Sequence, residues 1–414
     1  MSQANTNRKP WRRRALIAGA LLALAAGAIA QPAEEEPFWA KGRPKAGVGA
    51  KLAPVPAYPI ATAADQLPIN KIKLPPGFKA EVWASGVLDA RGMRQGDKGT
   101  VFVSSLFVAG KVYSVVDKGG PNGGSREVKT IAEKLFLPNG IEFINGALYV
   151  ATPKDITRYD NIEAQLDKPP KPVLVYDKLP GEVPHGWKFI KLGPDGKLYV
   201  PIGAPCNICD PGAGFAKIIK MNLDGSGVET VALGVRNSVG FDFDPKDGSL
   251  WFTNNGRDWL SEEMPNDTLN HVSAPGQQHF GFPYCHQGDF NDPEFGWGKQ
   301  CKDYAQPALL TGPHAGTLGM RFYTGQQFPA KYRGAMFIAR HGPWNRSIKY
   351  AADVIVAWPD GKGGIAKTEP FLTGLVENND YLGRPVDVLQ LKDGSMLVSD
   401  DHNGAIYRIS YSGL

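Results

Sequence analysis

Histidine and arginine residues flank a series of short apolar segments in this chain. His185 lies in the sequence EVPHGWKF, eight residues before the turn Gly193-Pro194-Asp195-Gly196. A histidine side chain has an ordinary pKa of about 6.5, so it is largely neutral at pH 7 and can accept a proton. His185 is therefore a candidate general base. The other candidates beside these segments are Arg91, Arg236, Asn237, Asn254, Asn255, Gly256, Arg257, Asp258, Arg340, His341, Arg384, Asp400 and Asp401.

The arginines among these candidates predict an anionic ligand. Taken alone, an arginine beside a strand is usually solvated or ion-paired, and a lone histidine is more often structural than catalytic. Several arginines that converge on one channel would repel one another unless an anion lies between them. Their recurrence at equivalent places beside the segments is the observation that favours a binding site.

The apolar segments belong to a repeat. In each, a glycine turn precedes a short β-prone strand, and the turn glycines are spaced by 47, 50, 52, 86 and 60 residues. A repeat of this length fits one four-stranded antiparallel sheet, which can bury both faces when several sheets pack radially. Six instances predict an all-β fold, a six-bladed β-propeller, and two β-sandwiches are the alternative. The instances are residues 98–105, 145–152, 195–203, 247–254, 333–340 and 393–400.

The four cysteines are Cys206, Cys209, Cys285 and Cys301. They allow three pairings, and short separations in an oxidising compartment favour Cys206–Cys209 and Cys285–Cys301. The first pair has the spacing of some metal and redox sites, but no second such pair accompanies it, and no histidine follows Cys209 as haem attachment requires. The step of 86 residues predicts a loop insertion over about 257–310, which a Cys285–Cys301 disulfide would stiffen.

The first 30 residues predict a signal peptide. They contain a basic start, the apolar run 15–30 and the cleavage pattern Ala28-Ile29-Ala30. Cleavage would give a periplasmic protein without a membrane span, and an uncleaved anchor is the alternative. Twin-arginine export is compatible with Arg13-Arg14. Residues 31–75, rich in Pro, Ala and Gly, predict an arm or linker, and residues 76–414 the propeller.

The net charge argues against nucleic acid as a partner. The chain has 46 basic and 41 acidic residues, and five of the basic residues but none of the acidic ones lie in residues 1–30. The remaining chain is therefore balanced. A nucleic-acid-binding surface needs a basic stripe, which a neutral body does not predict.

Four segments together resemble a known family. They are PHGWKFIKLGPDGKLYVPIG (184–203), GVRNSVGFDFDPKDGSLWFTNNGRD (234–258), ARHGPWNR (339–346) and GRPVDVLQLKDGSMLVSDD (383–401). The chain resembles the bacterial soluble aldose dehydrogenases that depend on pyrroloquinoline quinone (PQQ), and especially the branch called L-sorbosone dehydrogenases. The resemblance covers about residues 76–412. It implies oxidation of an aldose or a related aldehyde.

The resemblance also implies roles for individual residues. His185 would be the general base that takes the hydroxyl proton while hydride passes to PQQ, and Arg236 would stabilise the developing oxyanion. Backbone carbonyls of Gly256 and Arg257 would hold Ca²⁺, which prefers oxygen ligands and acts as a Lewis acid. The residues implied in cofactor binding, together with the remaining candidates beside the channel, are Arg91, Asn237, Arg340, His341, Arg384 and Asp401.

The chain departs from the glucose-oxidising members at three positions. Where they carry an aspartate that orients the base, this chain has Ala204, so another group must orient His185. A cofactor arginine corresponds to Val386, and a cofactor lysine to His341. The substrate pocket is therefore expected to differ, and glucose is not predicted as the substrate.

Two other function classes stay open at this stage. One is a Ca²⁺-dependent lactonase on the same fold, which would require a carboxylate-rich central site. The other is a non-catalytic propeller that binds sugars or proteins, since fold alone does not decide function. A dehydrogenase would need an external electron acceptor, cytochrome c or a quinone, because the chain contains no CxxCH haem-attachment sequence.

Overall fold

The computed structural model describes residues 57–119, 125–276 and 278–413. They lie in the compact unit Pro37–Leu414. The predicted signal peptide and most of the predicted arm lie outside the described residues. In the part of the chain that is described, no helix is both long and apolar enough to cross a bilayer.

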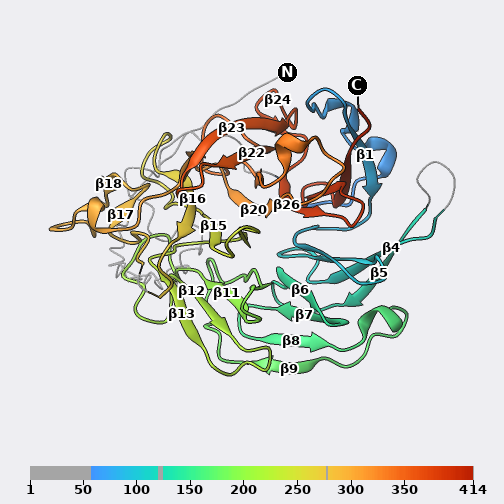
Figure 1. Ribbon diagram of the computed structural model, residues 1–414, viewed down its shortest axis with the longest axis horizontal. Coiled ribbons are helices and arrows are strands. Elements are labelled where there is room, and N and C mark those ends of the chain that lie inside the picture. The colour runs from blue at the N-terminus through green and yellow to red at the C-terminus, as the bar shows by residue number, and fades with distance from the viewer. Residues whose placement is uncertain (1–56, 120–124, 277, 414) are drawn as a thin grey trace, which may run out of the picture. The chain divides into compact units, whose positions relative to one another are not determined.

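Six four-stranded antiparallel sheets surround a central axis, which confirms the predicted six-bladed β-propeller (Figure 1). Each sheet is called a blade, and its strands are given from the axis outward. Blade 1 consists of β2 (Met93–Gln95), β3 (Val101–Ser104), β4 (Val112–Asp117) and β5 (Arg126–Ala132). Blade 2 consists of β6 (Gly140–Ile144), β7 (Ala147–Ala151), β8 (Ile156–Tyr159) and β9 (Val173–Tyr176). Blade 3 consists of β10 (Lys191–Leu192), β11 (Leu198–Ile202), β12 (Lys217–Met221) and β13 (Glu229–Leu233).

The last three blades follow in chain order, and the ring closes through the first strand of the chain. Because β1 pairs with β28, the two ends of the propeller share one sheet. Blade 4 consists of β14 (Phe241–Phe243), β15 (Leu250–Asn254), β16 (Asn266–Val272) and β19 (Leu309–Pro313). Blade 5 consists of β20 (Thr317–Phe322), β21 (Met336–Arg340), β22 (Asp353–Pro359) and β23 (Ile365–Leu372). Blade 6 consists of β26 (Pro385–Gln390), β27 (Met396–Asp400), β28 (Ala405–Tyr411) and β1 (Phe78–Ala84).

The repeated segments form the second strand of every blade. Their turn glycines all have positive φ, between 74° and 92°, a conformation that favours glycine. The third residue after each turn glycine is large and apolar or aromatic, and it packs in the apolar layers between blades. For example, Phe102 of blade 1 belongs to a cluster that includes Ile141 and Leu148 of blade 2. Since both faces of these strands are covered by neighbouring blades, they are continuous apolar runs rather than alternating ones.

The described part of the predicted arm contains two single-turn 3₁₀ helices, η2 (Ala64–Gln66) and η3 (Ile69–Lys71). It runs beside the turn after β27, where the N–H of Ile60 donates to the carbonyl of His402 and that of Thr62 to Asn403. The remaining short elements are η5 (Ile162–Ala164), η6 (Cys301–Asp303), η7 (Ala330–Tyr332), β17 (Cys285–His286), β18 (Phe290–Asn291), β24 (Val376–Glu377) and β25 (Asp380–Tyr381).

The long connection in blade 4 runs from β16 to β19 and covers residues 273–308, which we call the insertion. The range predicted for it, about 257–310, also includes β16, a strand of the blade itself. Both predicted disulfides are present: Cys206–Cys209 lies between β11 and β12, and Cys285–Cys301 joins the β17–β18 hairpin to η6.

The innermost strands carry a ring of charged side chains around the axis. One residue comes from each blade, and the sign alternates from blade to blade, so three cations and three anions close the ring. Arg94 pairs with Glu142 and lies 3.5 Å from Asp387, whereas Lys191 Nζ lies 3.4 Å from Asp242 Oδ1. We call this set the charge ring: Arg94, Glu142, Lys191, Asp242, Arg321 and Asp387.

Candidate active site

A cavity of about 740 Å³ lies at one end of the propeller axis. Most of its lining residues come from segments that precede a first strand or follow a second strand. In an antiparallel blade these two points lie at the same edge, so the six blades bring them together at one mouth. The predicted candidates that line this cavity are Arg91, His185, Arg236, Asn237, Asn255, Gly256, Asp258, His341 and Arg384.

His185 is held by a single backbone carbonyl. Its Nδ1 lies 2.9 Å from the oxygen of Ala204, so in the neutral ring Nδ1 carries the proton and donates it to this carbonyl. Nε2 is then left as a hydrogen-bond acceptor. Burial, with the nearby charge of Arg236, holds the pKa of His185 well below its ordinary value. The group that orients this histidine is therefore the backbone of Ala204.

The contact between His185 and Ala204 depends on the glycine before the alanine. A Cβ atom at Gly203 would lie 2.5 Å from the Cβ and the carbonyl oxygen of His185. The N–H of Ala204 donates to the carbonyl of Arg236 at 2.7 Å. Ala204, just after β11, therefore connects the side chain of His185 to the backbone of Arg236.

Arg236 is buried and makes four hydrogen bonds with its surroundings. Nε donates to the carbonyl of Asn207 at 2.9 Å, and Nη2 donates to Asn207 Oδ1 at 2.8 Å and to Asp258 Oδ2 at 3.1 Å. Nη1 donates to the carbonyl of Asn255 at 3.2 Å. Four of its five N–H groups are thus used to fix the guanidinium plane, and its charge is balanced by Asp258.

A second histidine is linked to an arginine through one carboxylate. Asp401 accepts from His341 Nε2 at 2.8 Å and from Arg91 Nη1 at 2.9 Å. Burial, then the charge of Arg384, lowers the pKa of His341 to about 4. His341 is therefore neutral at pH 7. Asp401 is not among the described residues that line the cavity, and it holds the two side chains that do.

Arg384 keeps more of its charge available than the other cavity arginines. Nε donates to the carbonyl of His341 at 3.1 Å and Nη2 to that of Gly342 at 2.7 Å. The ring of Tyr381 lies 4.8 Å from its guanidinium carbon. Among the described residues it forms no ion pair with a carboxylate, so its charge is the one that an anionic ligand could neutralise.

Two of the candidate arginines are not part of the described cavity lining. Arg340 does not belong to the described cavity lining, because Asp353 binds its Nε and Nη2 at 2.7 and 2.5 Å. Arg257 is not among the described lining residues either, and its side chain donates to Asp292 at 2.7 Å; the role predicted for Arg257 concerns its backbone carbonyl. Protein carboxylates also neutralise Arg91 and Arg236. Among the described arginines of the cavity, Arg384 is therefore the one whose charge favours an external anion.

Other cavity residues were not selected from the sequence. Aromatic side chains form part of the wall: Phe107 and Trp187 meet edge to face at 5.4 Å, as do Trp259 and Trp344 at 5.2 Å. Trp187 and Trp344 lie inside the motifs PHGWKF and HGPWNR, which was the available signal. Asn207 had no signal beyond its place between Cys206 and Cys209.

Comparison with known proteins supports the family. A model described as Glucose / Sorbosone dehydrogenase matches residues 174–409, more than half of the chain. An uncharacterized protein of Borreliella burgdorferi is 32% identical over 369 residues, which cover 85% of this chain and 94% of that protein. At this identity and coverage the relationship extends over nearly the whole propeller.

Several solved structures share the fold at low identity. The holo PQQ domain of a Coprinopsis cinerea pyranose dehydrogenase has a TM-score of 0.69 at 18% identity, over 87% of this chain and 100% of that one. A calcium structure of a Trichoderma reesei carbohydrate-active enzyme of family AA12 gives 0.69 at 18%, over 88% and 100%. PQQ-bound aldose sugar dehydrogenase of Streptomyces coelicolor gives 0.56 at 17%, over 82% and 100%. These likenesses show the fold, and the family match shows that the chain belongs to the Glucose / Sorbosone dehydrogenase family, a family of sugar oxidoreductases.

Proposed function

We propose that this protein is a PQQ- and Ca²⁺-dependent dehydrogenase that oxidises an aldose or a related aldehyde such as L-sorbosone. The observation that carries the proposal is the orientation of His185. Its Nδ1 is committed to the Ala204 carbonyl, which leaves Nε2 as the proton acceptor in the cavity. A neutral imidazole with one fixed nitrogen and one free nitrogen is the arrangement that a general base requires.

The chain's own residues supply two parts of the reaction. His185 accepts the proton of the substrate hydroxyl at Nε2, and its lowered pKa keeps it unprotonated at neutral pH. Arg236, fixed by Asn207 and Asp258, keeps one N–H of Nη1 for an oxygen that gains negative charge. Because these contacts are formed before substrate arrives, the guanidinium needs little rearrangement during the reaction.

The cavity fits PQQ in charge, size and surface. A volume of about 740 Å³ lies within the range of roughly 300–1,000 Å³ common for ligand pockets. Arg384 would pair with a carboxylate of the cofactor, and Arg91, Asn237 and His341 would contribute further polar contacts. The aromatic wall suits a flat ring system. When bound, PQQ supplies a two-electron acceptor, and Ca²⁺ supplies a Lewis acid beside it.

The donor set for Ca²⁺ would consist of oxygen atoms. Gly256 lines the cavity, and its backbone carbonyl and that of Arg257 would serve as ligands. The Asp267 carboxylate also lines the cavity, but it already accepts the N–H groups of Gly256, Gly316 and Thr317. A lactonase would need free carboxylates at this place, and both Asp258 and Asp267 are already engaged.

The proposal includes an exported protein with a separate electron acceptor. Cleavage after Ala30 would release the propeller into the periplasm, where cytochrome c or a quinone would reoxidise the cofactor. N-terminal sequencing of the exported protein tests the first part. A chain that starts at Met1 and sediments with the membrane would contradict it.

The decisive experiment uses purified protein freed of ligands. We expect PQQ with Ca²⁺ to give a saturable shift in quinone absorbance and to support dye reduction with an aldose or L-sorbosone. PQQ with EDTA is the control for the metal. Acid release from a lactone without dye reduction would favour a lactonase. Sugar binding without either reaction would favour a non-catalytic propeller.

A further inference from the structure

The connection between β15 and β16, residues 255–265, carries much of the cavity wall without any helix or strand of its own. Asn255, Gly256, Asp258 and Trp259 all line the cavity. A segment of this kind has no ladder to fix it, so its position depends on contacts with its neighbours. We call it the wall loop, and two disulfide-bridged segments contact it at adjacent residues.

The first contact is made by Asn207, which is buried between Cys206 and Cys209. Its side chain binds both backbone groups of Asp258: Oδ1 accepts the N–H at 2.7 Å, and Nδ2 donates to the carbonyl at 3.1 Å. The same residue accepts two N–H groups of Arg236. Asn207 therefore sets the positions of the wall loop and of Arg236 together.

The second contact is made by Asp292 of the insertion, on Arg257, the residue of the wall loop that precedes Asp258. Arg257 is fully buried and donates to Asp292 Oδ2 at 2.7 Å and to the more exposed Glu294 at 2.9 Å. Asp292 also binds His286 Nε2 at 2.7 Å and accepts the N–H groups of Glu294 and Phe295. The buried carboxylate is thus rigid in the insertion, and it holds the wall loop through Arg257.

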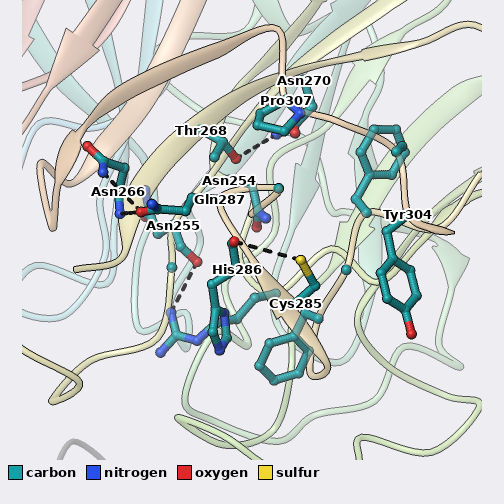
Figure 2. A pocket seen from close by; sticks show the side chains of 17 residues that line it. Asn254, Asn255, Asn266, Thr268, Asn270, Cys285, His286, Gln287, Tyr304 and Pro307 are labelled. Atoms are coloured by element: carbon teal, nitrogen blue, oxygen red, sulfur yellow. Dashed lines mark hydrogen bonds between the residues drawn. The ribbon is translucent and has the colours of Figure 1, made fainter. Parts of the chain in front are cut away.

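The insertion also meets blade 4 beside this contact. Figure 2 shows Cys285, His286 and Gln287 around a small pocket that Asn255 and Asn266 also line. This pocket has a volume of about 30 Å³. Gln287 Oε1 accepts the N–H of Asn266 at 2.8 Å and its Nδ2 at 3.0 Å, at the start of β16. The wall loop is therefore fixed where β16 begins as well as at Arg257.

One apolar cluster joins the two bridged segments to each other. Ile208 packs with Ala204 and Ala216 of blade 3 and with Phe282 of the insertion, and Cys206 and Phe295 lie against this cluster. Ala204 is also the residue whose carbonyl holds His185. Through this cluster the supports of His185, Arg236 and the wall loop form one connected structure outside the blade ladders.

From these contacts we propose that Asn207 and Asp292 are positioning residues, which hold the wall loop from two sides and so fix Arg236 and Gly256 at the cavity. The positional part of this inference needs only the contacts above. Its consequence for cofactor affinity rests on the proposed function. Neither residue is proposed to take part in the chemical step.

Hydrogen exchange in the ligand-free protein tests the positional part. We expect Asn207→Ala and Asp292→Asn each to speed exchange in peptides covering 255–265 by about tenfold or more, because each loses a buried contact worth at least about 1.4 kcal/mol. Exchange in β27 (Met396–Asp400) should stay as in the wild type. Glu294→Gln is the matched control, since it changes the exposed partner of Arg257 and should leave exchange nearly unchanged.

Two results would overturn the proposal. One is unchanged exchange over 255–265 in both variants, and the other is an equal loss of protection in the wall loop and in β27, which would mean a general loss of stability. If Asp292→Asn does not fold, Arg257→Met removes the same contact from the other side.

A PQQ titration then tests the functional consequence. Asn207→Ala should weaken binding about tenfold, and Glu294→Gln should not. Faster exchange together with unchanged PQQ affinity would refute the consequence alone, whereas no PQQ binding by the wild type would refute the proposed function and leave the positional result valid.

Discussion

The charge ring and the cavity use the same kinds of residue on the same six blades, yet they differ in how those residues are satisfied. In the ring, each cation has carboxylates for neighbours; Arg321 Nη2, for example, lies 3.3 Å from Asp387 Oδ2. At the cavity, Arg384 binds only backbone carbonyls with its two donating nitrogens, and His185 keeps one ring nitrogen free.

The difference shows that counting charges does not identify a site. Arg94 and Arg321 are as buried as Arg236 and also lie over the face of Phe189, at 4.9 and 5.3 Å. In the ring, each cation lies beside a carboxylate of a neighbouring blade, so the alternating charges balance one another. A functional assignment is better based on hydrogen-bonding capacity that the protein leaves unused, which points to the cavity.

The largest effect is expected from His185→Gln, which removes the free base from the cavity. Turnover should fall by about 10²–10⁴, the usual contribution of a general base. PQQ affinity and the unfolding temperature should stay close to wild-type values, since glutamine has a similar reach. Steady-state dye reduction, PQQ titration and thermal unfolding measure the three quantities. Near-normal turnover would leave His341 as the next candidate base.

Substitutions in the charge ring should lower the stability of the protein and leave its affinity for PQQ unchanged. Arg94→Met leaves Glu142 buried without its cation and should lower the free energy of unfolding by about 3–5 kcal/mol. Adding Glu142→Leu should restore much of this loss, because both partners are then apolar. Chemical denaturation measures the stability, and PQQ titration of the folded fraction should give the wild-type affinity. A large loss of affinity in Arg94→Met would remove the distinction between ring and cavity.

The fold was predictable because its signal is local. In every blade a turn glycine with positive φ precedes the second strand, and that strand is an apolar run. Both features can be read from residues that are neighbours in the sequence. The strand β16 was missed because its sequence, NDTLNHV, is polar. Its Asp267, Thr268 and Asn270 are nevertheless buried, since they form hydrogen bonds toward the cavity and within blade 4.

The candidate site was predictable as a set of positions but not as a set of contacts. The motifs identified His185, Arg236 and Arg384 as candidates, and the cavity brings these three together. The carboxylates that neutralise other arginines lie at no fixed separation in sequence: Asp353 is 13 residues from Arg340, whereas Asp401 is 310 residues from Arg91. Spacing cannot reveal such pairs, so the sequence could not separate Arg384 from Arg340.

A smaller effect than that of the ring is expected from Arg384→Ala. Losing a charge-assisted hydrogen bond of about 1.5–3 kcal/mol should raise the PQQ dissociation constant roughly 10- to 150-fold. Stability should change little, because Arg384 forms no ion pair with a carboxylate in the described chain. Arg158→Ala, which alters an exposed ion pair with Asp160, is the control for net charge. Equal affinities in wild type and Arg384→Ala would place the anion site elsewhere.

The smallest effect, taken per pH unit, concerns the acid stability of the ligand-free protein. The pKa of His341 is lowered to about 4, so the unfolded chain takes up a proton below about pH 6.5 that the folded chain refuses. The stability from this group is therefore complete above about pH 6.5 and is lost as the pH falls toward 4. Asp401, whose pKa is lowered chiefly by His341, loses its contribution only at more acidic pH. Arg384 and Arg91 are the other charges that face His341.

The expected slope is about 1.4 kcal/mol per pH unit for this histidine, with His185 adding a similar slope, and denaturation at several pH values measures it. His341→Gln should remove about one histidine's share between pH 6.5 and 4. An unchanged slope would mean that His341 titrates normally and that burial and the charge of Arg384 do not keep it neutral against the opposing effect of Asp401.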